Sequence, residues 1–251
     1  MRIYIHDKCM EQLFELPKNI QKEVLEFQKK FRENSKAEAI HLEPINTFKD
    51  PHLRTARIDG KYRAIVKVPQ SGEDYFLLWV DNHDEAMNWA KNKVFYWNEN
   101  TQTAQLFTVL TENVLEQPSS SNTEHPSLFA AYVAQQLIAL GVPESLLTLV
   151  YKIVDLNQLE ALEQNLPVDV YERLFYLIDG VPYTQLLAEI EEGKIQANSS
   201  IDPVQSNNNK RSFVEVDDTL MNEIINGELS KWQIFLHPSQ RKLVESSFKG
   251  L

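Results

Sequence analysis

The sequence lacks several features that mark particular classes of protein. It holds a single cysteine, Cys9, in 251 residues, which excludes an internal disulfide framework and fits a reducing compartment. It has no apolar run long enough to cross a bilayer, and its first residues lack the apolar segment of a secretory signal. We therefore expect a cytoplasmic protein without a membrane partner.

Basic residues are scarce in the second part of the chain. Residues 1–100 contain 16 Lys and Arg and 16 Asp and Glu, whereas residues 101–251 contain 9 and 20, so the second part carries the whole net charge of -11. An acidic surface repels nucleic acid and is better suited to a protein partner. Only the first part is therefore a candidate for binding nucleic acid.

A phosphate-binding loop of the form G-x-x-x-x-G-K-[ST] is also absent from the sequence. Without that backbone cradle and its lysine, we expect no ATPase in this polypeptide. His and Cys residues are scattered without the spacing of metal ligands, so we expect no metal site. The sequence thus predicts no cofactor in this chain.

Residues 53–90 are the most informative stretch. Residues 53–58 and 62–68 have the pattern of strands, and Asp59-Gly60 between them predicts a two-residue hairpin turn with Gly60 at positive φ. Residues 75–80 form a continuous apolar run, which is typical of a central strand buried on both faces. Residues 82–84 then offer N-cap candidates for a helix.

Basic residues are concentrated on this hairpin: they are Arg54, Arg57, Lys61, Arg63 and Lys67. With a two-residue turn, the alternation of side chains places all of them except Arg57 on one face of the sheet. A row of cations can bind a phosphate backbone, so Arg54, Lys61, Arg63 and Lys67 are the candidate nucleic-acid-binding residues. The alternative is a solvated face whose charges pair with local acids.

The remaining pattern predicts the division into domains. A strand at 1–5 and helices at 9–16 and 18–31 precede the hairpin, which predicts an α+β domain over residues 1–98 with helices packed on an antiparallel sheet. Residues 99–125 are a polar linker, and residues 126–192, where Pro begins and Gly ends successive helices, form a small all-α domain. Residues 193–212 have the composition of a disordered linker. A short C-terminal α/β segment, residues 213–251, contains a strand at 213–216 and a helix at 218–225.

The order of elements over residues 1–95 resembles the RelE/ParE toxin superfamily, as do the arginines of ARIDGKYRAIV and the histidine ending the last strand. In ribosome-dependent members, basic side chains hold mRNA while a 2′-hydroxyl attacks the adjacent phosphate. The resemblance implies that Arg57, Arg63, Lys61 and His83 are the catalytic candidates. Asp84 and Met87 stand where typical toxins carry Arg and Tyr. An RNA-cleaving toxin and a non-catalytic protein-interaction module both remain open.

A narrower resemblance points to UvrD-like superfamily 1 helicases of bacteria. WVDNHDEAMNWA resembles the end of a RelE-like module found in some of them, and LGVPESLLTLV and LPVDVYERLFYLIDG resemble the helical segment that follows it. WQIFLHPSQRKLVESSFKG resembles the beginning of the motor domain, where a Gln at the position of Gln240 contacts adenine.

This resemblance implies that residues 213–251 begin a motor domain and stop before its phosphate loop. ATP and Mg²⁺ would then bind only if a motor domain followed downstream. The chain would be an accessory or regulatory part of the helicase, with RNA or single-stranded DNA at its RelE-like sheet and a possible protein partner at its acidic helical domain.

Overall fold

The computed structural model describes residues 1–35, 37–69, 72–109, 126–200, 202–210 and 212–226. The chain divides into two compact units, one made of residues 1–91 and 213–251 and the other of residues 92–212. Within the described ranges, no helix combines the length and the hydropathy needed to cross a membrane. The general α+β class that the sequence predicts is confirmed.

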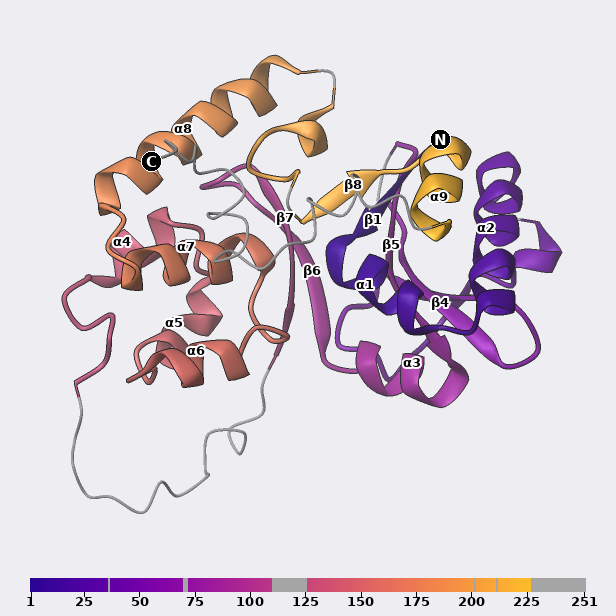
Figure 1. Cartoon of the computed structure of the whole chain (residues 1–251), viewed down its shortest axis with the longest axis horizontal. Helices are drawn as coiled ribbons and strands as arrows, with labels where there is room; N and C mark the ends of the chain where they lie inside the picture. The colour runs from indigo at the N-terminus through magenta and orange to yellow at the C-terminus, as the bar shows by residue number, and fades with distance from the viewer. Residues whose placement is uncertain (36, 70–71, 110–125, 201, 211, 227–251) are drawn as a thin grey trace, which may run out of the picture. The chain divides into compact units, whose positions relative to one another are not determined.

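A six-stranded sheet in the order β2-β3-β4-β5-β1-β8 forms the first unit (Figure 1). Its strands are β1 (Arg2–His6), β2 (Glu43–Pro44), β3 (Leu53–Arg57), β4 (Tyr62–Lys67), β5 (Asp74–Asn82) and β8 (Phe213–Glu215). All neighbours are antiparallel except β1 and β5, which are parallel. The sheet is therefore mixed, whereas we expected it to be antiparallel. Two parallel strands need a crossover connection between them, and the connection from β1 to β5 includes the helices that follow β1.

Helices cover both faces of this sheet. One face is covered by α1 (Asp7–Glu15), α2 (Lys18–Glu33) and α9 (Asp218–Ile225), and Figure 1 shows α9 in yellow beside α2 in indigo. Their apolar sides pack on Ala64, Val66 and Val80 in one core. The helix α3 (His83–Ala90) contacts β4 and β5. Its Trp89 stacks on Trp79, which alternates with Val80 along β5, so α3 lies on the opposite face. A short 3-10 helix, η1 (Glu38–Ile40), follows α2.

The elements within residues 126–192 are all helical, as we expected, but the second unit also contains a hairpin that precedes them. Its elements are β6 (Lys93–Asn98), β7 (Thr103–Thr108), α4 (Ala134–Ala139), η3 (Glu144–Leu146), α5 (Leu147–Val150), α6 (Leu156–Ala161), α7 (Val168–Ile178), α8 (Tyr183–Ser199) and η4 (Pro203–Gln205). The strand β7 occupies part of the predicted linker 99–125. Its Thr103 and Gln105 look like linker residues in the sequence, but both are buried and hydrogen-bonded to Asp169.

The predicted disordered linker at 193–212 also differs from the structure. The helix α8 continues to Ser199, and a loop containing η4 follows it. Asn209 is fully buried in this loop, where its Oδ1 accepts a hydrogen bond from the Ala104 amide at 2.7 Å and its Nδ2 donates to the Gln102 carbonyl at 2.9 Å. The polar residues that suggested disorder therefore hold the loop in place, because buried amides need partners.

The predicted boundary at 98 differs as well, whereas the boundary at 213 coincides with the residue at which the chain returns to the first unit. The first unit ends at Lys91 and resumes at Phe213, so residues 213–226 complete its sheet and core rather than beginning a separate domain. Gln28 of α2 donates to the Val216 carbonyl at 2.9 Å, and Met221 of α9 is fully buried. The remainder of the predicted motor segment, including Gln240, lies outside the described residues.

Candidate nucleic-acid interface

The turn between β3 and β4 decides which basic residues share a face. Ile58 donates its amide to the Tyr62 carbonyl at 3.1 Å, so three residues, not two, form the loop. The Asp59 carboxylate accepts hydrogen bonds from the amides of Lys61 and Tyr62, each at 2.7 Å. Gly60 is not among the glycines with positive φ. An Asp side chain that bonds to amides further along the chain thus replaces the expected glycine turn.

The extra loop residue shifts the pairing by one position. Arg57 lies opposite Arg63, whereas we expected it opposite Tyr62. Residues directly opposite each other in a sheet project to the same face, so the two arginines are neighbours. Arg54 lies opposite Val66, which belongs to the core beneath α1 and α2, and is therefore not on the face of Arg63. We expected Arg54 on the face of Arg63 and Arg57 on the opposite face. Both predictions are wrong, because the loop contains one residue more than we assumed.

Arg57 and Arg63 keep their charge available. Arg57 is exposed, and Arg63 is half-buried with its Nη1 donating to the carbonyls of Asp59 at 3.1 Å and Tyr62 at 2.9 Å. Within the described part of the chain, neither guanidinium forms an ion pair with a carboxylate. Asp81 of β5 is the residue paired with Arg63 between β4 and β5, but its Oδ2 accepts a hydrogen bond from the Gln12 side chain at 2.9 Å. Backbone carbonyls orient Arg63 without neutralising it.

Two of the predicted basic residues are engaged elsewhere. The Arg54 guanidinium donates to the carbonyls of Pro51 and Leu53 at 2.5 and 3.0 Å. Lys67 forms an ion pair of 3.5 Å with the buried Asp50. Burial lowers the pKa of Lys67, and the charge of Asp50 opposes this effect. Lys67 therefore has a structural partner, and the structure does not place Arg54 or Lys67 beside the loop.

His83 lies beside the hairpin loop. Its amide donates to the Lys61 carbonyl at 2.8 Å, and α3 begins at this residue, with Asn82 as N-cap accepting from the Glu85 amide at 3.2 Å. The imidazole is 52% exposed, and its Nδ1 lies 2.9 Å from an oxygen of Asp84. The structure thus brings His83 to the same end of the sheet as Lys61 and Arg63.

One end of the sheet therefore collects Arg57, Lys61, Arg63 and His83. Lys61 is exposed in the loop, and its side chain has no ion pair with any described residue. Asp59, the nearest acid in sequence, uses its carboxylate to hold the loop. Such a cluster can donate hydrogen bonds to the oxygens of a phosphate or carboxylate. The described residues contain no group of His, Cys, Asp and Glu that could hold a metal ion.

The members of this cluster are those that the family resemblance implied, whereas the alternation of side chains alone had placed Arg57 on the other face. The signal that could have corrected the pairing was Asp59, whose short carboxylate is well suited to a turn that bonds to amides two and three residues later. The engagement of Lys67 by Asp50 carried no such local signal. Comparisons of the chain with protein-family models, with curated proteins and with solved structures found no match.

Proposed function

We propose that the first unit binds single-stranded nucleic acid through Arg57, Lys61 and Arg63, and that the chain is an accessory part of a UvrD-like helicase without an ATPase of its own. The observation that supports binding is the pair of arginines at opposed positions of β3 and β4. Neither has a carboxylate partner among the described residues, and Lys61 lies in the adjoining loop.

The arrangement carries an energetic cost in the free protein. Like charges directly opposite each other in a sheet destabilise the pairing. An anion that lies between two guanidiniums offsets this repulsion and accepts charge-assisted hydrogen bonds from both. Carbonyl contacts on Arg63 reduce the conformational freedom that binding would otherwise remove. The geometry therefore favours an anionic ligand at this end of the sheet.

The helicase setting rests on the resemblance of WVDNHDEAMNWA and the helical segments to UvrD-like helicases. A helicase produces single strands, so a module attached to it would meet its ligand as the motor works. A sheet end with three cations binds weakly and without base readout, because phosphate contacts carry no sequence information. This is the behaviour expected of a module that tracks a backbone beside a motor.

RNA cleavage is the second candidate, favoured by the exposed His83 beside Lys61. A ribonuclease of this kind needs an acid or base and a cation at one phosphate. Asp84, 97% exposed and bonded to the His83 ring, places a negative charge where the phosphate charge would develop. Binding is therefore better supported than cleavage.

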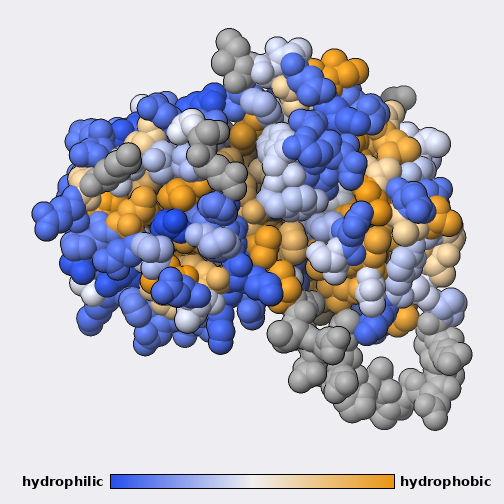
Figure 2. Space-filling view, turned by 180° about the vertical axis from the view of Figure 1, so that it is seen from behind, coloured by the Kyte–Doolittle hydropathy of each residue, from blue (hydrophilic) through white to orange (hydrophobic). Residues whose placement is uncertain are grey.

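A protein-binding role for the sheet is less well supported. The large hydrophobic residues that are clearly exposed in the described ranges are Leu128, Val133, Leu156 and Ile195, and all belong to the second unit. The face of the molecule in Figure 2 shows hydrophobic residues in separate patches among hydrophilic ones. A toxin-like sheet that binds a partner helix would need an apolar groove on the first unit.

The test is the salt dependence of oligonucleotide binding by the full chain. Fluorescence anisotropy of a labelled single strand, measured over a series of salt concentrations, gives the slope of log K against log salt. We expect Arg57→Ala and Arg63→Ala each to weaken binding and to reduce the slope by about 0.7, the value of one phosphate contact on a single strand.

Arg54→Ala is the matched control, because it removes an arginine of the same hairpin that lies on the other face. It should leave affinity and slope unchanged. Equal losses in all three variants would indicate diffuse charge attraction, and unchanged binding in Arg57→Ala would refute the proposed interface. Ribosome-dependent cutting of mRNA by the full chain would favour the ribonuclease.

A further inference from the structure

A second group of cations lies on the first unit, at the opposite end of α3 from the proposed interface. Lys91 directly follows α3, and its carbonyl accepts a hydrogen bond of 2.9 Å from the Lys49 amide. Both lysines are exposed, and within the described part of the chain neither side chain forms an ion pair. The backbone contact therefore brings two available ammonium groups together, and we call them the Lys49–Lys91 pair.

The hairpin of β3 and β4 shows where this pair lies. Lys67 is the last residue of β4 and forms an ion pair of 3.5 Å with Asp50, the residue after Lys49. Lys61, in contrast, belongs to the loop that joins β3 to β4. The Lys49–Lys91 pair therefore lies at the end of the hairpin that is remote from this loop.

Two elements give the distance between the cationic ends. The helix α3 begins at His83, whose amide donates to the Lys61 carbonyl, and its eight residues span about 12 Å. Along β4, the distance from Arg63 to Lys67 is about 13 Å, because each residue of a strand advances about 3.3 Å. The two estimates agree, so the two cationic groups are separated by about the length of α3.

Both groups lie on the same face of the sheet. Arg63 and Trp79 alternate along their strands with Ala64 and Val80, which belong to the core beneath α1 and α2. Trp79 contacts α3 through its ring. Arg63 is thus on the face that α3 covers, and Lys91 continues α3 on that face.

Packing holds α3 firmly on the sheet between the two groups. Ala86 and Ala90 are fully buried, and the rings of Trp89 and Trp79 stack with their centroids 4.9 Å apart. The Asn82 side chain caps the first turn. The helix is therefore a fixed spacer, and a ligand that reaches both groups does not have to order the element between them.

Acidic side chains limit the route between the groups. Asp84 and Glu85 are exposed in the first turn of α3, so they repel a polyanion from a path directly over the helix. The helix contacts β4 and β5, whereas Arg57 belongs to β3 and Lys49 to the segment that leads into β3. A route on the β3 side of α3 therefore has cations at both ends, and it passes Glu43, an exposed acid of β2.

We propose that one single strand binds the first unit at two points, with one phosphate at Arg57, Lys61 and Arg63 and another at the Lys49–Lys91 pair. This inference rests on the proposed nucleic-acid binding and adds the length of strand that the site requires. A strand whose bases stay stacked advances about 3.4 Å per phosphate, so about four phosphates span the two points. Contact at one point raises the local concentration of phosphate at the other, so a strand that reaches both binds more tightly than a shorter one.

Fluorescence anisotropy of the full chain with labelled thymidine oligonucleotides, from the dinucleotide to the octanucleotide, tests the proposal. Affinity should rise most where the strand becomes long enough for both points. Lys49→Ala and Lys91→Ala should each weaken octanucleotide binding by about twofold to fivefold, the size of one exposed ion pair. Each should also reduce the salt slope by about 0.7. Neither should change binding of the dinucleotide, which reaches one point only and is held by the arginines.

Lys22→Ala is the matched control, because Lys22 is an exposed lysine of α2, on the other face of the sheet. Octanucleotide binding that depends on Arg57 and Arg63 but on neither Lys49 nor Lys91 would overturn the two-point inference and leave the proposed interface intact. Binding that Arg57→Ala leaves unchanged would refute the interface itself. An equal loss in Lys22→Ala, or an equal loss with the dinucleotide, would indicate diffuse charge attraction and also overturn the inference.

Discussion

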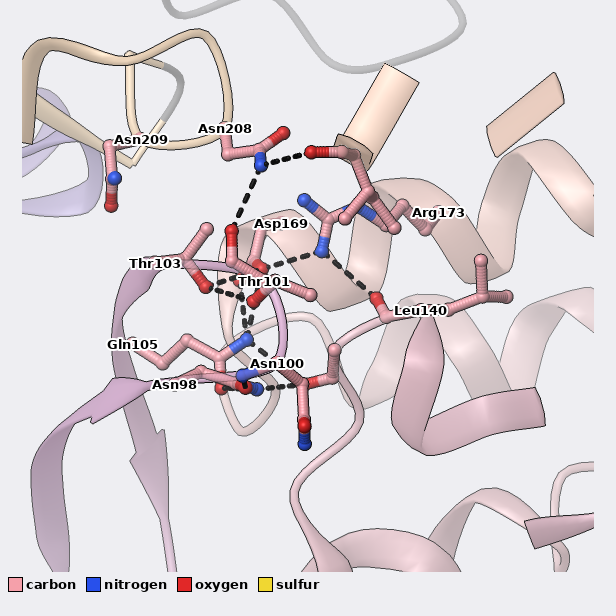
Figure 3. A network of polar contacts seen from close by, with 12 residues as sticks. Asn98, Asn100, Thr101, Thr103, Gln105, Leu140, Asp169, Arg173, Asn208 and Asn209 are labelled. Carbon is pink, nitrogen blue, oxygen red and sulfur yellow. Dashed lines mark hydrogen bonds and ion pairs between the residues drawn. The ribbon is translucent and has the colours of Figure 1, made fainter. Parts of the chain in front are cut away.

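At the scale of single residues, the second unit buries charged side chains that have hydrogen-bond partners, among them Lys93 and Asp169 (Figure 3 shows Asp169 with its partners). Lys93 at the start of β6 is 8% exposed, and its Nζ donates to the Gln164 carbonyl at 2.7 Å. Burial lowers the pKa of this lysine to about 8, although the hydrogen bond favours the charged form. Asp169 shows the opposite case, since burial raises its pKa while Arg173 and Gln105 oppose the shift.

Lys93 makes stability depend on pH in the alkaline range. Its pKa is about 8 in the folded chain and 10.5 as an ordinary lysine. Between these values the unfolded chain binds more protons than the folded chain, so the free energy of unfolding rises with pH. The rise from this group is on the order of 3 kcal/mol over the whole interval.

Lys93→Met should remove that rise. Denaturant unfolding followed between pH 7.5 and 9.5 measures it. Tyr96, whose pKa is raised from 10.0 to about 12, affects the free energy of unfolding mainly between those two values, above this range. Lys152→Met, an exposed lysine of the same unit, should keep the wild-type slope. A slope that persists in Lys93→Met would show that another group carries the pH dependence.

At the scale of elements, β8 and α9 are bound to the first unit by contacts on two sides. The Val216 amide donates to the Ile3 carbonyl at 3.2 Å, and Arg32 of α2 donates to the Val216 carbonyl at 2.7 Å. Arg32 also forms an ion pair with Asp218. On the core side, Met221 is fully buried against α2 residues of the same cluster. These contacts make the segment part of the hydrophobic core.

Met221→Ala should therefore destabilise the whole first unit and not only α9. Truncating a fully buried Met leaves a cavity and costs about 2–5 kcal/mol. Hydrogen exchange should show faster opening of amides in β1 and β5 as well as in α9. Thr219→Ala, on the exposed side of the same helix, should change little. Exchange that accelerates in α9 alone would mean that the segment opens independently.

The elements also show what the sequence could predict. Periodicity correctly placed α2 and β5, because the buried residues of α2 are mostly apolar and recur at helical spacing, and β5 is an apolar run buried on both faces. It failed at β7, where Thr103 and Gln105 are polar but buried. Both form hydrogen bonds with Asp169, which is 66 and 64 residues away from them in the sequence. Long-range polar contacts of this kind leave no local pattern in the sequence.

The candidate interface shows the same limit at finer resolution. The residue types of the hairpin predicted a cationic site, but one extra residue in the turn changed which arginine lies beside Arg63. A shift of one residue moves every side chain of a strand to the other face. Turn length follows from the hydrogen bonds of Asp59, so the face of Arg57 depends on one side chain outside the strands.

At the scale of the whole molecule, the second unit is an insertion into the first. The chain leaves the first unit after Lys91 and returns at Phe213 to add β8 beside β1. The first unit therefore cannot complete its sheet from residues 1–91 alone. Pairing of strands so far apart in sequence carries an entropic cost of loop closure. Folding of the second unit reduces this cost, because residues 92–212 are then compact and no longer behave as a long flexible loop.

Replacing residues 92–212 by a flexible linker of about 20 Gly and Ser residues should leave the first unit folded and able to bind the oligonucleotide. All the hairpin residues and both of their partner elements remain in this variant. Residues 1–91 alone should unfold at lower denaturant concentration and with a lower m-value, because β8, α9 and their share of the core are missing.

Denaturant unfolding and anisotropy on the two variants separate the contributions of the units. Cooperative unfolding of the linked variant with unchanged salt slope would place both the fold and the proposed interface within the first unit. A linked variant that fails to fold would mean that the second unit supplies more than closure of the chain. Full stability of residues 1–91 alone would contradict the role given to β8 and α9, because Gln28 and Arg32 would then lose their hydrogen bonds to Val216 without cost.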